Sequence, residues 1–214
     1  MRTCMLTGAS GRLGSDFIAR YSSTYQIAAV TRRRDVSLVG AAVTIRADLS
    51  RHAEVTEAVH TAISAIGPID LVVNAAAIYG HQIAEGFDKV LIVNVAAPAW
   101  LTEAVTNRCW INRSGSVPRP SVINVSSTCG HIAYAEWGSS AYPASKAALN
   151  MLTIGMADQL APLGVRVNAL APNSFPMLVS TAHVTNTIVE LDRGEDTGRI
   201  RVLDVDGDYW LDET

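Results

Sequence analysis

The sequence predicts an α/β fold in which a doubly wound parallel sheet of about seven strands lies between two layers of helices. Three observations favour it. Apolar runs alternate with segments of helical periodicity along most of the 214 residues. The run at residues 69–73 is apolar throughout, which is typical of a parallel strand covered on both faces. A glycine-rich turn also joins the first strand to the first helix.

Turn residues and apolar periodicity delimit the elements in chain order. Strands are expected at residues 2–7, 27–31, 42–47, 69–73, 121–125, 165–171 and 199–203. Helices are expected near residues 13–21, 51–66, 87–110, 142–163 and 182–191; Gly67 and Pro68 end the second, and Gly164 closes the fourth. The acidic tail from Asp204, which carries Tyr209 and Trp210, is expected to pack on the sheet or against a partner subunit.

Composition indicates a single domain over residues 1–214, because 49% of the residues are hydrophobic. A net charge of −3 gives no electrostatic reason to expect binding to nucleic acid or a membrane, and no stretch looks apolar enough to span a bilayer. Cys4, Cys109 and Cys129 lack metal-site spacing and indicate buried thiols in a reducing cytoplasm. No metal is expected.

The glycine-rich turn has the chemistry of a dinucleotide site. Gly8 permits a tight turn, Gly11 lets the backbone approach a pyrophosphate, and Gly14 lets the helix pack close to the strand. The free N–H groups of the helix then face the phosphates. The turn is therefore expected to bind a cofactor through these glycines together with Ser10, Arg12 and Leu13. An ordinary glycine-rich loop is the alternative.

The end of the second strand predicts which dinucleotide binds. A site for NAD places an acid there, but this chain has Thr31 followed by Arg32, Arg33 and Arg34. Guanidinium groups match a 2′-phosphate in charge and geometry, so the sequence favours NADP, bound through Thr31, Arg32 and Arg33. A solvated basic turn is the alternative.

Two further strand ends carry candidate cofactor contacts. Asp48 and Leu49 follow the third strand, where an acid can accept a hydrogen bond from adenine or can cap the next helix. The fourth strand ends in Asn74, Ala75 and Ala76, whose small side chains leave room for a cofactor.

Candidate catalytic residues follow. Tyr142 and Lys146 lie four residues apart, on one face of a helix. A neighbouring ammonium moves the pKa of a tyrosine from about 10 toward working pH, although a shared face by chance is the alternative. Ser127 follows the fifth strand, where its hydroxyl can polarise a carbonyl or cap the strand end. Asn94, inside an apolar helix, must use its amide to hold a water or kink the helix.

In this order, these motifs resemble the short-chain dehydrogenase/reductase family. The resemblance implies a Rossmann fold with three α/β/α layers, and an NADP-dependent oxidoreductase of the ketoreductase or alcohol dehydrogenase type. The matching residues span nearly the whole chain: Thr7, Gly8, Gly11, Gly14, Asp48, Leu49, Asn74, Ala75, Ala76, Asn94, Ser127, Tyr142, Lys146, Arg166, Val167, Asn168 and Pro172.

The resemblance also implies roles. Tyr142 would be the general acid in carbonyl reduction, and Lys146 would lower its pKa and bind the nicotinamide ribose. Ser127 would hydrogen-bond the substrate oxygen; it is preferred over Ser126 because it precedes the small residues before Gly130. Asn94 would hold a water that links Lys146 to solvent. The expected partners are a small carbonyl or alcohol and, as the family implies, the same chain in a homodimer or homotetramer.

The sequence departs from the family in several places, including Ala76 and Asn173 where the family has glycine, and two of the departures bear on the expected site. Two residues rather than three separate Gly8 from Gly11, which puts Arg12 in the phosphate turn. The segment after Pro172 is short, so the substrate lid is expected to be reduced. Two other functions stay open: a non-catalytic NADP-binding sensor, which needs no Tyr142, and a redox-neutral isomerase, cyclase or epimerase that recruits the same tyrosine.

Overall fold

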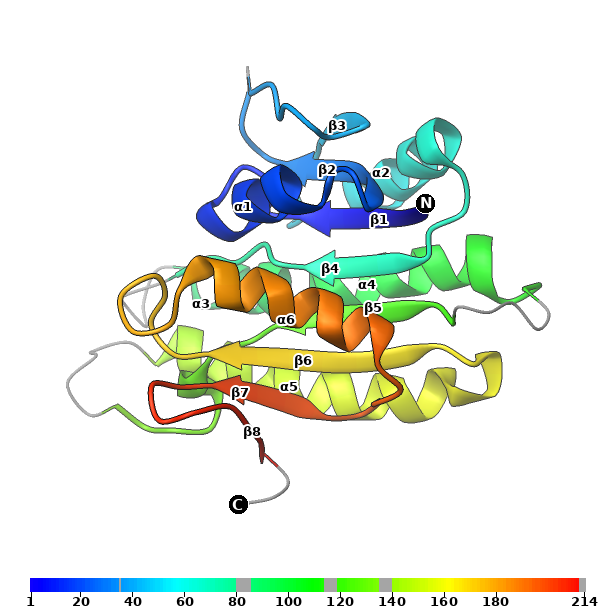
Figure 1. Ribbon diagram of the computed structural model, residues 1–214. Coiled ribbons are helices and arrows are strands. Elements are labelled where there is room, and N and C mark those ends of the chain that lie inside the picture. The colour runs from blue at the N-terminus through cyan, green and yellow to red at the C-terminus, as the bar shows by residue number, and fades with distance from the viewer. Residues whose placement is uncertain (35, 80–85, 114–118, 135–139, 212–214) are drawn as a thin grey trace.

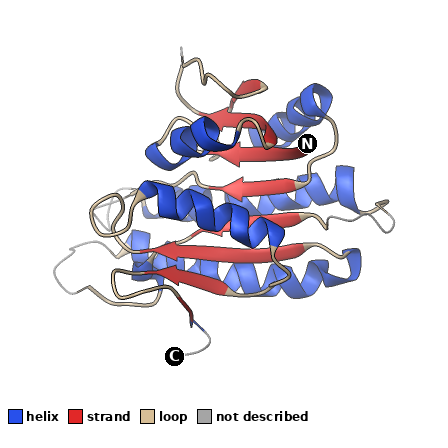
Figure 2. Cartoon of the chain, in the orientation of Figure 1, coloured by secondary structure: helices blue, strands red, loops and turns tan. Residues whose placement is uncertain are grey.

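The computed structural model describes residues 1–34, 36–79, 86–113, 119–134 and 140–211. In these residues an eight-stranded sheet has helices on both faces (Figure 1), and the strands form a central layer between them (Figure 2). The strand order is β3-β2-β1-β4-β5-β6-β7-β8, and every neighbouring pair is parallel except β7 and β8. This order confirms the predicted doubly wound α/β fold.

The strands are β1 (Arg2–Thr7), β2 (Tyr25–Thr31), β3 (Val43–Arg46), β4 (Leu71–Asn74), β5 (Ser121–Val125), β6 (Arg166–Pro172), β7 (Ile200–Leu203) and β8 (Tyr209–Trp210). The α-helices are α1 (Arg12–Tyr21), α2 (His52–Ile66), α3 (Phe87–Leu91), α4 (Ala97–Val105), α5 (Ala141–Leu160) and α6 (Thr181–Arg193).

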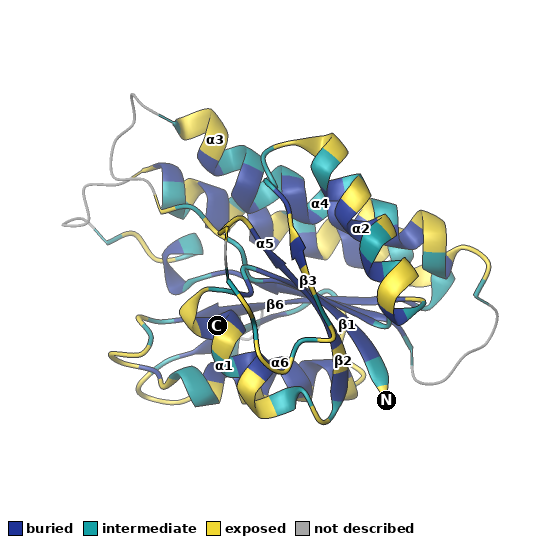
Figure 3. Cartoon of the chain, turned by 90° about the horizontal axis from the view of Figure 1, so that it is seen from above, coloured by how far each residue is buried: buried dark blue, intermediate teal, exposed yellow. Residues whose placement is uncertain are grey.

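Two apolar cores lie on opposite faces of the sheet, one under α1 and α6 and the other under α2, α4 and α5 (Figure 3). Successive side chains of a strand point to opposite faces. On β1, Cys4 and Leu6 therefore enter the first core, whereas Met5 between them enters the second. Burial on both faces is the physical reason why the strands have continuous apolar runs.

The strand count differs from the sequence-based expectation. Tyr209 and Trp210 form an eighth strand, antiparallel to β7. The Trp210 ring lies below the guanidinium groups of Arg199 and Arg201, whose carbons are 4.2 and 5.2 Å from the ring centroid. The tail was expected to pack either on the sheet or against a partner subunit, and in the structure its residues Tyr209 and Trp210 pack on the sheet. A strand of two residues is too short for its periodicity to be recognised from sequence.

The long helix expected near residues 87–110 is continuous but irregular. α3 runs into a π-helical turn at Ile92–Ala96, α4 follows, and a second π-helical turn spans Thr106–Trp110. Contrary to the expectation from sequence, Phe87–Trp110 passes the length and composition test for a membrane span, with half of its most apolar window buried in the fold. The buried core helices of many proteins pass the same test, so this evidence is weak.

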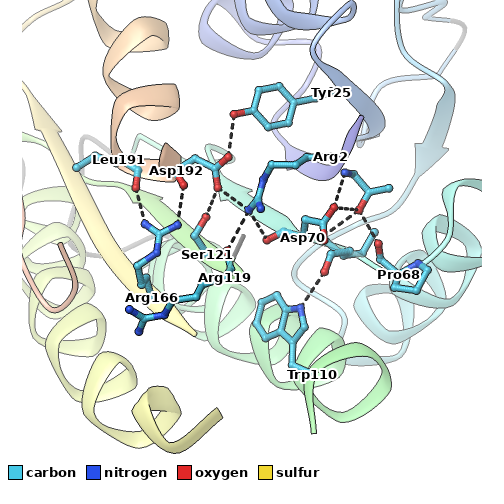
Figure 4. Close-up of polar contacts among 12 residues, drawn as sticks. Arg2, Tyr25, Pro68, Asp70, Trp110, Arg119, Ser121, Arg166, Leu191 and Asp192 are labelled. Atoms are coloured by element: carbon cyan, nitrogen blue, oxygen red, sulfur yellow. Dashed lines mark hydrogen bonds and ion pairs between the residues drawn. The ribbon is translucent and has the colours of Figure 1, made fainter. Parts of the chain in front are cut away.

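A buried polar network lies at the amino edge of the sheet (Figure 4). The Asp192 carboxylate, at the end of α6, accepts hydrogen bonds from Arg2 Nη2 at 2.9 Å, from the Tyr25 hydroxyl at 2.8 Å and from the Ser121 hydroxyl. Arg166 donates to the carbonyl oxygens of Leu191 and Asp192 at 2.7 and 2.6 Å. These contacts join α6 to four strands at the edge opposite the candidate site.

Candidate active site

A cavity of about 250 Å³ lies at the carboxyl ends of β1, β2 and β4. The order of the strands reverses between β1 and β4, and open α/β sheets bind ligands at such a switch point. Most of the expected cofactor contacts line it: Gly8, Ser10, Gly11, Thr31, Arg32, Arg33, Asp48, Leu49, Ala75 and Ala76. Sequence reasoning missed five other lining residues: Val30, Ala47, Ala77, Ile78 and Val93.

The glycine turn packs directly against the loop after β4. Gly8 has a φ of +67°, and a Cβ there would lie 2.8 Å from the Ala75 backbone. The Thr7 hydroxyl accepts hydrogen bonds from the backbone N–H groups of Ala75 and Ala76, at 3.1 and 3.2 Å. A Cβ on Gly14 would lie 2.5 Å from the Ala9 Cα. A side chain at Gly8 would therefore push the turn away from the loop after β4, and one at Gly14 would push α1 away from the turn.

The start of α1 has the properties of an anion site. Gly11 is its N-cap, no side chain caps the free N–H groups, and the first turn holds no acidic residue. Leu13 and Gly14 are buried behind the turn, so they shape it rather than line the cavity. Arg12 is exposed and does not line the cavity.

The side of the cavity formed by β2 and β3 carries charge. The hydroxyls of Ser10 and Thr31 are 2.7 Å apart, and Thr31 Oγ1 accepts the N–H of Arg33 at 3.1 Å. Hydrogen bonds from the side chain and backbone of Ser50, helped by the charge of Arg32, hold the pKa of Asp48 below its usual value. The Asp48 carboxylate thus accepts both hydrogen bonds of Ser50 in the turn before α2 and also lines the cavity. It does not cap α2, whose N-cap is Arg51 without a side-chain hydrogen bond, and its contact with adenine stays a prediction.

A second, open hollow borders the cavity and shares Thr31 and Arg33 with it. It is lined by Thr31, Arg33, Arg34, Val36, Ser37, Thr44 and Arg46. Over the described residues, the structure gives the side chains of Arg33, Arg34 and Arg46 neither a hydrogen bond nor an ion pair. Three unpaired guanidinium groups in one hollow repel one another, and an anion relieves that repulsion.

The expected catalytic side chains gather beyond β5. Lys146 is 2% exposed, and its Nζ donates to the Val125 carbonyl at 2.7 Å. The same Nζ lies 5.4 Å from the centroid of the Tyr142 ring, which also packs against the Tyr79 ring at 4.9 Å. The Ser127 side chain lies close enough to Tyr142 to lower the pKa of its phenol. The fold therefore brings Ser127, Tyr142 and Lys146 together at the carboxyl edge of the sheet.

A family model described as short chain dehydrogenase matches residues 2–187. The chain belongs to the short-chain dehydrogenase/reductase family. It is 35% identical over 179 residues to "Carbonyl reductase [NADPH] 2" of Sus scrofa, covering 78% of this chain and 69% of the relative. A member of this family with such relatives is an NAD(P)-dependent oxidoreductase.

Solved structures of other short-chain dehydrogenases agree with this fold. A short-chain type dehydrogenase/reductase from Mycobacterium marinum superposes with a TM-score of 0.85 and 25% identity, covering 95% of this chain and 94% of that one. An oxidoreductase of the same family from Brucella ovis, in complex with a partially ordered NAD, gives a TM-score of 0.76 and 26% identity over 94% and 98% of the two chains.

In this short-chain dehydrogenase the two titratable groups are shifted mainly by burial. Burial raises the pKa of Tyr142, with smaller upward effects from Cys129 and Tyr79, and the Ser127 side chain opposes them. Burial lowers the pKa of Lys146 to about 8. The expected lowering of the Tyr142 pKa by Lys146 is thus not found in the structure, because the phenol is desolvated and the ammonium bonds to Val125 instead.

The buried ammonium makes stability depend on pH in one direction. The pKa of Lys146 in the folded protein is about 8, below the ordinary value of 10.5. Burial of the charged group therefore lowers the free energy of unfolding by its full amount below pH 8. This cost disappears as the pH rises toward 10.5. We expect Lys146→Met to remove a cost of roughly 3 kcal/mol at about pH 7, partly offset by the lost bond to Val125, and little cost at about pH 10. Urea denaturation at both pH values measures this; an equal effect at both would contradict it.

Asn94 lies in the π-helical turn between α3 and α4. Its Oδ1 accepts the Ile78 N–H at 2.8 Å, and its Nδ2 donates to the Ile78 carbonyl at 3.0 Å and to the Ser145 hydroxyl at 3.0 Å. The side-chain amide is therefore used to join three segments, at a point where the helix departs from α geometry. Sequence reasoning missed Ser145, whose one signal was its place directly before Lys146.

Besides Arg12, Leu13, Gly14, Tyr142 and Lys146, two further expected cofactor contacts, Asn74 and Pro172, lie outside the cavity lining. Asn74 is buried in the sheet, where its Nδ2 donates to Asn124 Oδ1 at 2.9 Å. Pro172 ends β6 and pairs with Leu203 of β7. Among the residues that the structure describes, no cluster of three or more His, Cys, Asp or Glu side chains is placed to hold a metal.

Proposed function

We propose that this enzyme transfers hydride between NADP(H) and a carbonyl or secondary alcohol, with Ser127, Tyr142 and Lys146 as its catalytic residues. The observation that carries the proposal is the juxtaposition of these side chains at the sheet edge that also holds the cavity beside the glycine turn. A close approach at Gly8, a bare helix N-terminus and unpaired arginines fit a phosphate-bearing dinucleotide.

Each residue has a role that follows from its surroundings. NADPH, when bound, supplies the hydride. Tyr142, whose pKa burial raises, keeps its proton at neutral pH and donates it to the carbonyl oxygen as the negative charge develops there. The Ser127 hydroxyl donates a hydrogen bond to the same oxygen. The charge of Lys146 near the Tyr142 ring stabilises the phenolate that remains after proton transfer.

NADP preference is supported by the arginines around β2 and β3. Arg32 and Arg33 line the cavity, and Arg33 also lines the neighbouring hollow with Arg34 and Arg46. Asp48 is the one carboxylate among the described residues that line the cavity, and it already accepts hydrogen bonds from the backbone and side chain of Ser50. A guanidinium pairs with a 2′-phosphate through charge-assisted hydrogen bonds that a ribose hydroxyl cannot offer.

The double substitution Arg32→Ala with Arg33→Ala tests this preference. We expect the dissociation constant of NADPH to rise by about 30-fold or more, because two charged hydrogen-bond donors are lost, while that of NADH changes by less than about threefold. Calorimetric titration with both nucleotides measures the effect. Arg51→Ala, which removes an exposed arginine paired with Glu54, is the matched control. Equal weakening of the two nucleotides would show that the arginines are not a phosphate clamp.

A turnover assay tests the reaction class. The protein is incubated with NADPH and a panel of ketones and quinones, and the absorbance of the reduced nicotinamide is followed. A decrease that depends on both substrate and enzyme supports hydride transfer. Tight NADPH binding without any decrease would favour the sensor alternative, and conversion of a substrate without net oxidation would favour a redox-neutral enzyme.

A further inference from the structure

We propose that Ser145 is a positioning residue for Tyr142; this proposal rests on the proposed function. The buried Ser145 hydroxyl links the first turn of α5, where Tyr142 lies, to the π-helical turn that holds Asn94. Asn94 in turn links it to the wall of the cofactor cavity. Neither the family match nor the motifs single out this residue. The proposal is carried by a continuous chain of hydrogen bonds between described residues.

The hydroxyl of Ser145 uses both of its hydrogen-bonding functions. It is completely buried, it donates to the Tyr142 carbonyl at 2.7 Å, and it accepts from Asn94 Nδ2 at 3.0 Å. Asn94 is 1% exposed, and its amide holds both backbone groups of Ile78. Ile78 in turn lines the cavity. The path from cavity wall to Tyr142 is therefore made of four hydrogen bonds, three of them from one amide.

The location of these bonds gives them an effect beyond stability. Tyr142 lies in the first turn of α5, where few helical bonds hold the backbone. The opposing segment is a π-helical turn, which also deviates from regular geometry. Ser145 is the side chain that bonds to both. Without it, each segment is free to shift relative to the other, and a small displacement of a proton donor lowers the rate of proton transfer steeply.

Ser145→Ala is the test, and its readout separates positioning from general stability. We expect kcat to fall about 10-fold while the KM for NADPH changes by less than about twofold, because the phosphate-binding end of the cavity is untouched. Ser145→Cys keeps a weak donor and acceptor of similar size and should recover much of the rate. Thr102→Val is the matched control, since Thr102 is also a buried helical hydroxyl but bonds to Pro98 of its own helix at 2.8 Å.

Hydrogen exchange of the same variants gives a readout that needs no turnover. We expect amides of residues 92–96 and 142–146 to exchange faster in Ser145→Ala and to stay protected in Thr102→Val. If no carbonyl substrate causes the wild-type protein to oxidise NADPH, the proposed reaction is wrong. The exchange result still decides whether Ser145 couples the two segments. Unchanged exchange, or a loss of kcat that Thr102→Val reproduces, would overturn the inference.

Discussion

Tyr142→Phe is expected to lower kcat by about 10³-fold or more while NADPH still binds. The substitution removes one oxygen and keeps the ring that packs against Tyr79 and lies near Lys146. What is lost is the proton donor, and general acid catalysis is worth about 10²–10⁴-fold. Steady-state oxidation of NADPH measures the rate, and calorimetric titration measures the binding.

The matched control for this experiment is Tyr21→Phe. It removes a phenolic hydroxyl that bonds to Asn186 at 2.6 Å, between α1 and α6 on the other face of the sheet. We expect its kcat to stay within about twofold of wild type, since the hydroxyl touches no part of the site. If Tyr142→Phe retains the wild-type rate, Tyr142 is not the proton donor. If it loses NADPH binding as well, the loss of rate reports cofactor affinity rather than catalysis.

Asp192→Asn is expected to lower the free energy of unfolding by roughly 3–5 kcal/mol, although Asp192 lies at the edge of the sheet opposite the candidate site. The Asp192 carboxylate has no exposed surface, and it accepts bonds from Arg2, Tyr25 and Ser121 (Figure 4). An amide of the same size removes the charge that compensates Arg2, and its NH₂ group faces donors instead of acceptors. Breaking one side of a buried charge pair costs more than the pair itself contributes.

Urea denaturation of Asp192→Asn beside Glu57→Gln measures this cost. Glu57 also changes from carboxylate to amide, but its side chain is 75% exposed and lies 3.9 Å from His60. We expect the control to change the free energy of unfolding by less than about 0.5 kcal/mol. The same small value for Asp192→Asn would mean that the network is not a determinant of stability. Activity per folded molecule should be similar to wild type in both variants.

Local chemistry accounts for what could be predicted. Continuous apolar runs predicted the parallel strands, because both faces of the sheet are covered. Glycine at positions 8 and 14 was explained by the need for a tight turn and close packing. In the structure, backbone atoms lie too close to both positions to leave room for a Cβ. The cofactor cavity follows from the same reasoning, because residues directly after parallel strands share one edge of the sheet.

The sequence by itself determined the order of the main elements, the edge of the sheet at which the candidate site lies and the residue types gathered there, since each depends on neighbours within a few positions of the chain. Only the tertiary structure decided the β8 pairing, the Asp192 network and the path from Ile78 through Asn94 to Ser145. It also decided that burial, rather than the Lys146 charge, sets the direction of the shift in the Tyr142 pKa. Burial and long-range hydrogen bonds depend on which distant segments meet, and spacing along one chain carries no record of that.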